Sequence, residues 1–329
     1  MKALHLVVLR YGRLGDLVMI EPALRWAVSV PSLSVSLVTD AHYVSLFETL
    51  LPGVTVCTEV PPSCDLILDL HRVRGSRVAR RGNPWVGVTK EDLRRRALVH
   101  LPALGLKPSY SWPERHLAAM ERALLRLGLE LPSRPAATPS FRPAVESSKR
   151  RLGLVLGAGH ATKRWPLRHW EDLASQWRGE VVSFVGPGEE HLAELAGILP
   201  WPDTALEGLV AGLASCEVVV AGDTGPLHLA GALGCAVVGL FGPTPTEAGF
   251  WLWEEQGTAL RLAGLDCSPC HLHGSAVCPE AHHRCLEDLS PSEVLSALQG
   301  LLLPSEAPPR TVAGLEGPPA SSRTQRRMP

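Results

Sequence analysis

Three short segments of this 329-residue chain combine glycine with side chains that could transfer a group or bind an anion. The first, Arg10-Tyr-Gly-Arg-Leu-Gly-Asp16, follows an apolar strand and places Asp16 where a helix N-cap is expected. A capping aspartate alone would contribute about 1 kcal/mol. The alternative is a general base facing a cleft, kept ionised near neutral pH by the helix N-terminus.

The second segment, Gly157-Ala-Gly-His-Ala-Thr-Lys-Arg-Trp-Pro166, also follows an apolar strand. Backbone N–H groups of a glycine-rich loop can approach phosphate closely. Thr162 adds a hydroxyl, and Lys163 adds a charge that can neutralise a diphosphate. The spacing matches neither the dinucleotide fingerprint nor the P-loop. A surface loop with incidental basic residues is the other interpretation.

The third segment contains Asp223, Thr224, Gly225 and His228 between an apolar strand and a helix that begins with proline. Free N–H groups in the first turn of that helix form an anion site. The alternative is a helix cap beside a buried structural histidine.

Two further turns follow predicted strands. Glu189 or Glu190, after Gly186, could bind the hydroxyls of a ribose, or simply begin a charged helix. The segment 242–246, Gly-Pro-Thr-Pro-Thr, either lines the same pocket or is only a turn.

Four cysteines are clustered near the C-terminus, interleaved with histidines: Cys267, Cys270, Cys278 and Cys285. The spacing allows a structural zinc that braces a loop beside the cleft. A disulfide-tied loop and free thiols are the alternatives, and a reducing cytosol disfavours the disulfide. The remaining cysteines lie among apolar residues and are expected in the core.

Strands and helices must alternate to position these segments. Strands are expected at 3–9, 33–39, 54–59, 66–70, 152–156, 181–185, 218–221 and 236–241. Helices are expected at 17–30, 44–51, 167–177, 189–199, 206–214, 225–233 and 292–303, and 90–128 is expected to be largely helical. This order predicts an α/β protein with two doubly wound parallel sheets. Ligands bind such sheets at the carboxyl ends of the strands, where every segment above lies.

The expected domains are 1–135, a linker at 136–150, a second domain at 151–303, and a disordered tail at 304–329. A formal net charge of −1 gives no overall attraction to nucleic acid. The N-terminus does not fit a signal peptide. The uncharged stretch 225–246 is long enough to cross a bilayer, but its glycines and prolines predict a helix and a strand instead. A cytoplasmic protein is expected, with peripheral contact to the inner membrane face left open.

Together these segments resemble glycosyltransferase family 9, the ADP-heptose:lipopolysaccharide heptosyltransferases. The resemblance includes Pro22-Ala-Leu24 after the first segment, and Ala232-Leu-Gly234 and Phe241-Gly-Pro-Thr244 after the third. The cysteine cluster and the following Leu-Ser-Pro-Ser-Glu-Val294 are similar to the heptosyltransferase II branch. The resemblance spans most of residues 1–303.

The resemblance implies a two-domain GT-B fold, with the acceptor in the N-terminal half and the donor in the C-terminal half. It implies inverting, metal-independent transfer without a cofactor, from a nucleotide diphosphate sugar (ADP-heptose above all) to a lipopolysaccharide-core-like or other cell-envelope glycan. No nucleic acid and no obligate protein partner are implied. By analogy, Asp16 removes the acceptor proton with Arg10 and Gly15 beside it. The donor would be held by Gly157, Thr162, Lys163, Glu189, Asp223, Thr224, Gly225 and His228, with Lys163 stabilising the leaving diphosphate.

Two other functions fit the same sequence. One is a sugar-nucleotide epimerase or hydrolase with the same architecture. The other is a non-catalytic protein that binds a sugar nucleotide or glycolipid.

Overall fold

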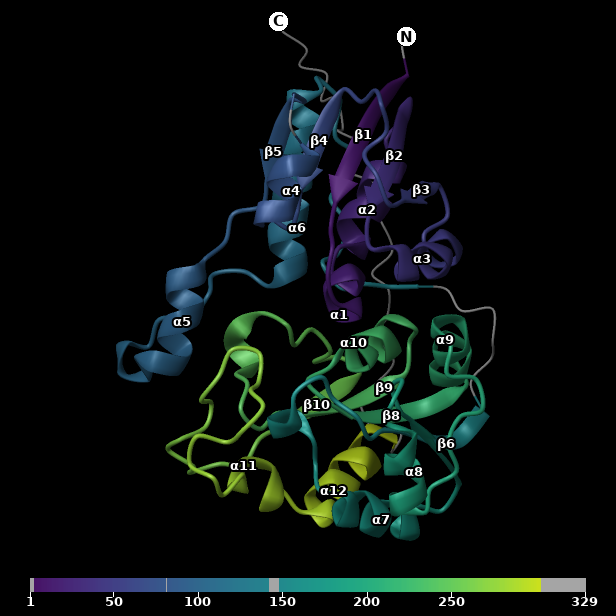
Figure 1. Ribbon diagram of the computed structural model, residues 1–329, viewed down its shortest axis with the longest axis vertical. Coiled ribbons are helices and arrows are strands. Elements are labelled where there is room, and N and C mark those ends of the chain that lie inside the picture. Colours follow the sequence, from purple (N-terminus) through teal and green to yellow (C-terminus); the bar gives the residue numbers. More distant parts are fainter. Residues whose placement is uncertain (1–2, 81, 142–147, 303–329) are drawn as a thin grey trace, which may run out of the picture.

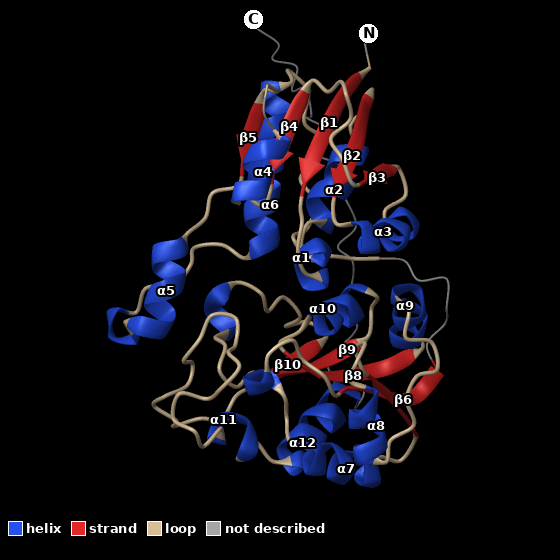
Figure 2. Ribbon diagram, in the orientation of Figure 1, coloured by secondary structure: helices blue, strands red, loops and turns tan. Residues whose placement is uncertain are grey.

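The computed structural model describes residues 3–80, 82–141 and 148–302, and two lobes are stacked along its long axis (Figure 1). Each lobe contains one five-stranded sheet, in the orders β3-β2-β1-β4-β5 and β10-β9-β8-β6-β7 (Figure 2). Every paired strand runs parallel to its neighbour. This confirms the predicted α/β class with two parallel sheets.

The N-terminal lobe consists of β1 (Leu4–Leu9), α1 (Leu14–Val18), α2 (Glu21–Val28), β2 (Leu33–Val38), α3 (Val44–Leu50), β3 (Val54–Cys57), β4 (Leu66–Asp69), α4 (Arg74–Ala79), β5 (Trp85–Gly87), α5 (Asp92–His100) and α6 (Trp112–Arg126). The C-terminal lobe consists of β6 (Ser148–Val155), α7 (Leu167–Gln176), β7 (Glu180–Phe184), α8 (Glu190–Ala196), α9 (Leu206–Ala214), β8 (Cys216–Gly222), α10 (Gly225–Ala232), β9 (Ala236–Leu240), β10 (Gly257–Leu260), α11 (Arg284–Glu287) and α12 (Pro291–Leu302).

The central strands are buried because helices cover both faces of each sheet. The last four residues of β1 are fully buried, and so are all four of β4. Such strands consist of continuous apolar runs, which is why the sequence predicted them well. The short elements β5, β10 and α4 were missed, since three to six residues leave little periodicity.

The single helix expected at 17–30 is wrong, because the structure has two helices there. Pro22 lies in the first turn of α2, and proline has no N–H to donate to the preceding turn. The expected capping role of Asp16 is also wrong. Helix α1 begins at Leu14 with Arg13 as its N-cap, and the N–H of Asp16 donates to the Arg13 carbonyl at 3.0 Å. The Asp16 side chain is therefore not used as a cap.

The predicted domain boundaries stay predictions. Strand β6 begins at Ser148, inside the range expected as linker. Residues 142–147 of that linker and the predicted tail, 304–329, lie outside the described residues. Within the described part of the chain, no helix is both long enough and apolar enough to cross a bilayer.

Candidate active site

A cavity of about 1320 Å³ lies between the two lobes, at the carboxyl ends of their strands. The loop after β1 and the loop after β4 supply its N-terminal wall. The opposite wall comes from the loops after β6, β7 and β8 and from residues 271–274. The predicted residues that line it are Gly15, Asp16, Gly157, Lys163, Glu189, Asp223, Thr224, Gly225 and His228. The structure thus gathers segments up to 213 residues apart into one site.

The Asp16 carboxylate is held in place by an ion pair with Arg10. Arg10 is buried, and its guanidinium lies 2.8 Å from Oδ1 of Asp16 and donates to the Leu70 carbonyl at 2.8 Å. The other oxygen, Oδ2, faces Gly12, where an added Cβ would lie 3.6 Å away. Arg10 therefore orients the carboxylate, and Oδ2 remains available to a ligand in the cavity.

His71, which nothing in the sequence singled out, shares this corner of the cavity. Its ring lies over Gly12, with Cε1 4.0 Å from the position of an added Cβ. Burial, together with the nearby Arg10 charge, lowers the pKa of His71 below its usual value. His71 therefore lies beside the Asp16 carboxylate with a weakened affinity for a proton. Its position after an ordinary buried strand gave no signal in the sequence.

Lys163 and Asp223 form the opposite side of the cavity. The Nζ atom of Lys163 lies 2.9 Å from Oδ2 of Asp223, and both side chains are largely buried. His228 lies 3.8 Å from the other Asp223 oxygen. Burial by itself raises the pKa of Asp223, but the His228 interaction and the Lys163 charge outweigh it and hold this pKa below its usual range.

Helix α10 points its N-terminus into the cavity. Its N-cap, Thr224, makes no side-chain capping bond, and the Thr224 hydroxyl has no hydrogen-bond partner among the described residues. Gly225 and Pro226 follow on the same wall. Uncapped N–H groups at a helix start attract anions, so this end of α10 can bind a phosphate.

Gly157 has no room for a side chain because Glu189 lies directly against it. A Cβ on Gly157 would lie 1.7 Å from Oε2 of Glu189. Arg164 pairs with the same carboxylate at 2.6 Å and also donates to the Ala158 carbonyl. Oε1 of Glu189 accepts from Arg164, and Oε2 accepts from the Gly186 N–H at 3.2 Å, so the carboxylate is fixed over the β6 loop. Glu190 is exposed and begins α8.

Thr162 is the predicted donor-binding residue that the structure separates from the others. Its hydroxyl donates to the Ser275 carbonyl at 2.8 Å and accepts from the Ser275 N–H at 2.9 Å. Thr162 is buried and does not line the cavity. The hydroxyl fastens the β6 loop to the cysteine-rich loop instead of facing a ligand.

The cysteine-rich loop packs directly on Lys163. A Cβ on Gly274 would lie 2.6 Å from Cδ of Lys163, and the N–H groups of Cys270 and His271 donate to the Pro243 carbonyl. Residues 271–274 of this loop line the cavity, so the loop lies beside the cleft as expected. It also gives the turn at 242–246 a structural role in anchoring that loop.

The four clustered cysteines are free thiols in the structure. Burial, and then the proximity of the other three thiols, raises the pKa of Cys285 to about 12. Cys267 also lies 3.9 Å from Nε2 of His282. In the described residues, no group of three or more ligating side chains is arranged to hold a metal ion. A structural zinc stays a prediction.

Phe250 and Arg95 were not predicted from the sequence as site residues. Arg95 belongs to the N-terminal lobe and Phe250 to the C-terminal lobe, and the two side chains contact each other. The Arg95 guanidinium stacks 4.7 Å from the Trp112 ring centroid and 5.5 Å from that of Phe250. Phe250 lines the cavity beside His228 and His273. Burial and the Arg95 charge lower the pKa of His273. An aromatic and imidazole wall therefore adjoins the charged groups.

The model of glycosyltransferase family 9 (heptosyltransferase) matches residues 94–279. Lipooligosaccharide heptosyltransferase 2 of Campylobacter jejuni serotype O:2 is 29% identical over 173 residues, which cover 48% of this chain and 53% of the relative. Lipopolysaccharide heptosyltransferase 2 of Escherichia coli K12 is 28% identical over 228 residues, 60% of this chain and 64% of the relative. The chain thus spans about half to two thirds of the length of these curated relatives.

Solved structures share the whole fold. The E. coli ADP-heptose lipopolysaccharide heptosyltransferase II superposes with a TM-score of 0.67 and 20% identity, covering 93% of this chain and all of the other. A family 9 glycosyltransferase from Veillonella parvula gives a TM-score of 0.71 and 16% identity, with 92% and 98% covered. The two lobes therefore have the GT-B architecture.

Proposed function

The chain belongs to glycosyltransferase family 9, and from this premise we propose that it transfers a sugar, with inversion, from a nucleotide diphosphate onto a glycan hydroxyl. The proposed donor is ADP-heptose, and the proposed acceptor is a lipopolysaccharide-core-like or other cell-envelope glycan. One observation carries the proposal: Asp16 of one lobe and the Lys163–Asp223 pair of the other line a single cavity.

Asp16 is the proposed general base. As the acceptor hydroxyl oxygen attacks the anomeric carbon, its proton passes to Oδ2 of Asp16, the oxygen that Arg10 leaves free. The proposal needs the acceptor to approach from the N-terminal lobe, where Asp16 and His71 lie. Attack from this side, with the donor on the opposite wall, inverts the anomeric centre.

Lys163 and the N-terminus of α10 are the proposed stabilisers of the leaving group. The bond from the anomeric carbon to the phosphate oxygen breaks, and its electron pair goes to the nucleoside diphosphate. Lys163 and the uncapped N–H groups near Thr224 provide positive charge where this negative charge develops. These fixed groups support a transfer step that does not depend on a metal ion.

Asp223 and His228 are proposed to position Lys163. Glu189 is proposed to contact the donor with the side of its carboxylate that Arg164 and the Gly186 N–H leave open. Thr162 is proposed to act indirectly, by fastening the β6 loop, because its hydroxyl faces Ser275. We further propose a cytoplasmic enzyme without a cofactor, a nucleic-acid ligand or an obligate protein partner.

A donor screen followed by a transfer assay tests the proposal. ADP-, UDP- and GDP-sugars are compared by thermal shift, because a ligand that binds the native state raises the melting temperature. ADP-heptose is expected to stabilise the protein and to yield a glycosylated product only with acceptor present. Rapid release of altered sugar or free ADP without acceptor would favour an epimerase or hydrolase. Binding with no product under any acceptor would favour a non-catalytic binding protein.

A further inference from the structure

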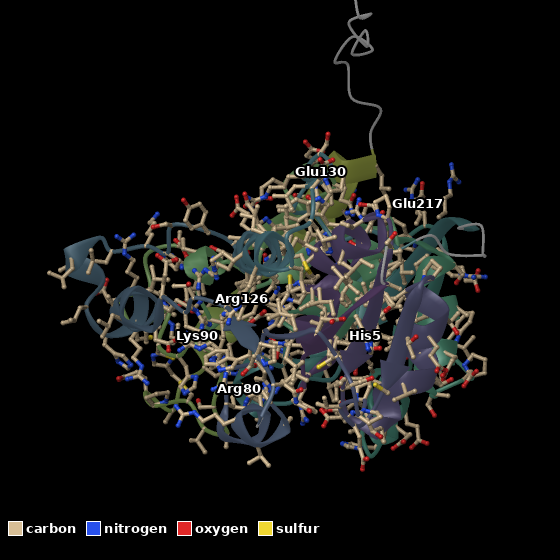
Figure 3. The ribbon with its side chains drawn as sticks, turned by 90° about the horizontal axis from the view of Figure 1, so that it is seen from above. His5, Arg80, Lys90, Arg126, Glu130 and Glu217 are labelled. Atoms are coloured by element: carbon tan, nitrogen blue, oxygen red, sulfur yellow. The ribbon has the colours of Figure 1, made fainter. Side chains whose placement is uncertain are left out.

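Helix α5 and the segment after it project from the body of the protein. In Figure 1 and in the perpendicular view of Figure 3, this part of the chain lies at the edge of the molecule, away from both sheets. Only Arg95 and Ala97 are buried among the described side chains of α5. The remaining positions from Asp92 to Tyr110 are mostly exposed. This projection therefore has a free outer face.

Exposed apolar side chains are concentrated in this projection. Of the eleven large hydrophobic side chains that are exposed in the described chain, five belong to this projection: Leu93, Leu101, Leu104, Leu106 and Tyr110. Each is at least 43% exposed, and Leu93 is 84% exposed. A local concentration of exposed apolar side chains marks an interaction site, whereas single ones need no explanation.

Basic side chains are interspersed with these leucines. Arg94 donates to Oγ of Ser109 at 2.6 Å. The side chains of Arg96 and Lys107 are exposed and make no hydrogen bond or ion pair with any described residue. Free cations beside apolar side chains match the chemistry of an anionic lipid surface, where leucine enters the acyl boundary and lysine or arginine meets the headgroups.

We propose that residues 93–107 form a docking surface for an anionic lipid bilayer. The proposal rests on the proposed function, since a cell-envelope acceptor carried by a lipid would be presented at such a surface. The same helix connects the surface with the site: the buried side chain of Arg95 stacks on Phe250, which lines the cavity. Docking through α5 would therefore engage the helix whose buried Arg95 contacts a residue of the cavity wall.

Vesicle flotation of the full-length chain tests the apolar half of the surface. Wild type is expected to float with phosphatidylcholine/phosphatidylglycerol vesicles and at least tenfold less with phosphatidylcholine alone. Replacing Leu93, Leu101 and Leu104 by serine should reduce binding at least tenfold. The matched control replaces Leu195 and Leu199, equally exposed leucines of the C-terminal lobe, and should bind like wild type.

Charge reversal tests the electrostatic half. Each basic residue near an anionic surface strengthens binding about fivefold, so the R96E/K107E variant should bind anionic vesicles at least tenfold more weakly. The difference should shrink as salt is raised. Circular dichroism and thermal melting should match wild type, because neither side chain has a partner in the described structure.

Three results would overturn the docking proposal. They are wild-type protein that ignores anionic vesicles, a leucine variant that still binds fully, and a control variant that loses as much. A leucine-dependent dimer by light scattering, with no vesicle binding, would assign the surface to a second copy of the chain instead. Transfer to a water-soluble acceptor fragment should be unchanged in all these variants. A wild-type chain that transfers to the soluble acceptor but does not bind anionic vesicles thus counts against docking alone. A wild-type chain that binds the vesicles but does not transfer counts against the proposed function alone.

Discussion

Gly15 and Gly225 contact each other across the two lobes. A Cβ on Gly15 would lie 3.3 Å from the Cα of Gly225, and a Cβ on Gly225 would lie 3.0 Å from the backbone N of Gly15. Helices α1 and α10, which carry Asp16 and His228, therefore approach to backbone contact (Figure 1). The short separation between Asp16, the proposed base, and the start of α10 is possible because both Gly15 and Gly225 lack a side chain.

Gly225→Ala is expected to force α1 and α10 apart. The new methyl group would lie 2.9 Å from Cβ of Leu14 as well as against the Gly15 backbone, and backbone cannot rotate away. Transfer should fall at least tenfold, since misplacing reacting groups by about 1 Å can cost a hundredfold, while ADP affinity changes less. Gly300→Ala in α12, where a Cβ meets nothing within 4 Å, is the control and should raise stability slightly. Equal activity of both variants would refute this role of the contact.

Gly157→Ala should displace Glu189. The added methyl group would overlap its carboxylate, and Arg164 would then lose its partner. We expect a raised KM for the donor, with a smaller change in kcat. Gly159→Ala provides a control in the same loop, because the space around Gly159 is open and its backbone conformation is ordinary. A KM that rises equally in both variants would mean that the loop, and not Glu189, is affected.

Lys163→Met should destabilise the protein as well as abolish transfer. It leaves Asp223 buried without its cation, and breaking a buried pair costs about 3 kcal/mol. The K163M/D223N double variant should recover most of that stability in denaturant melts, yet remain inactive because the leaving group has no cation. Recovered activity in the double variant would remove Lys163 from the chemistry.

His116 should make stability depend on pH. Burial, with the nearby Arg10 charge, lowers the pKa of this fully buried histidine from 6.5 to about 3, and one ring nitrogen is bonded to the Met19 carbonyl. In the unfolded chain the ring binds a proton below about pH 6.5. The unfolded state therefore binds more protons, and stability falls as pH drops from 6.5 toward 3, by about 1 kcal/mol between pH 6 and 5.

Urea melts at pH 6 and pH 5 check this. In His116→Asn, the free energy of unfolding should no longer show the loss between pH 6 and pH 5 that His116 causes. Replacing the exposed His191 by Asn should leave that loss unchanged. An unchanged slope in His116→Asn would assign the acid sensitivity to other groups.

The sequence predicted much of the fold because the buried parallel strands are long apolar runs ending in glycine-rich loops. It also predicted the segments that line the cavity, since glycine beside Asp16 or Lys163 at a strand end has few structural explanations. It could not place Thr162, whose hydroxyl is bound by a loop 113 residues away. It could not identify His71 or Phe250, because nothing local distinguishes a histidine or phenylalanine that faces a cavity from one in an ordinary loop.

The ion pairs inside the cavity could not be predicted from the sequence either. Lys163 with Asp223, and Arg10 with Asp16, were each expected to meet a substrate, but the structure shows that they first hold each other. Such pairs depend on which loops come together at one edge of a sheet, and this is set by the tertiary fold.

The most direct measurement compares sugar transfer with nucleotide binding in Asp16→Ala. If Asp16 removes the acceptor proton, kcat should fall by a factor of at least about 100, while the ADP dissociation constant stays within threefold of wild type and the protein melts normally. A variant that keeps wild-type turnover would contradict the central claim that this carboxylate, facing Lys163 across the cavity, performs the chemistry.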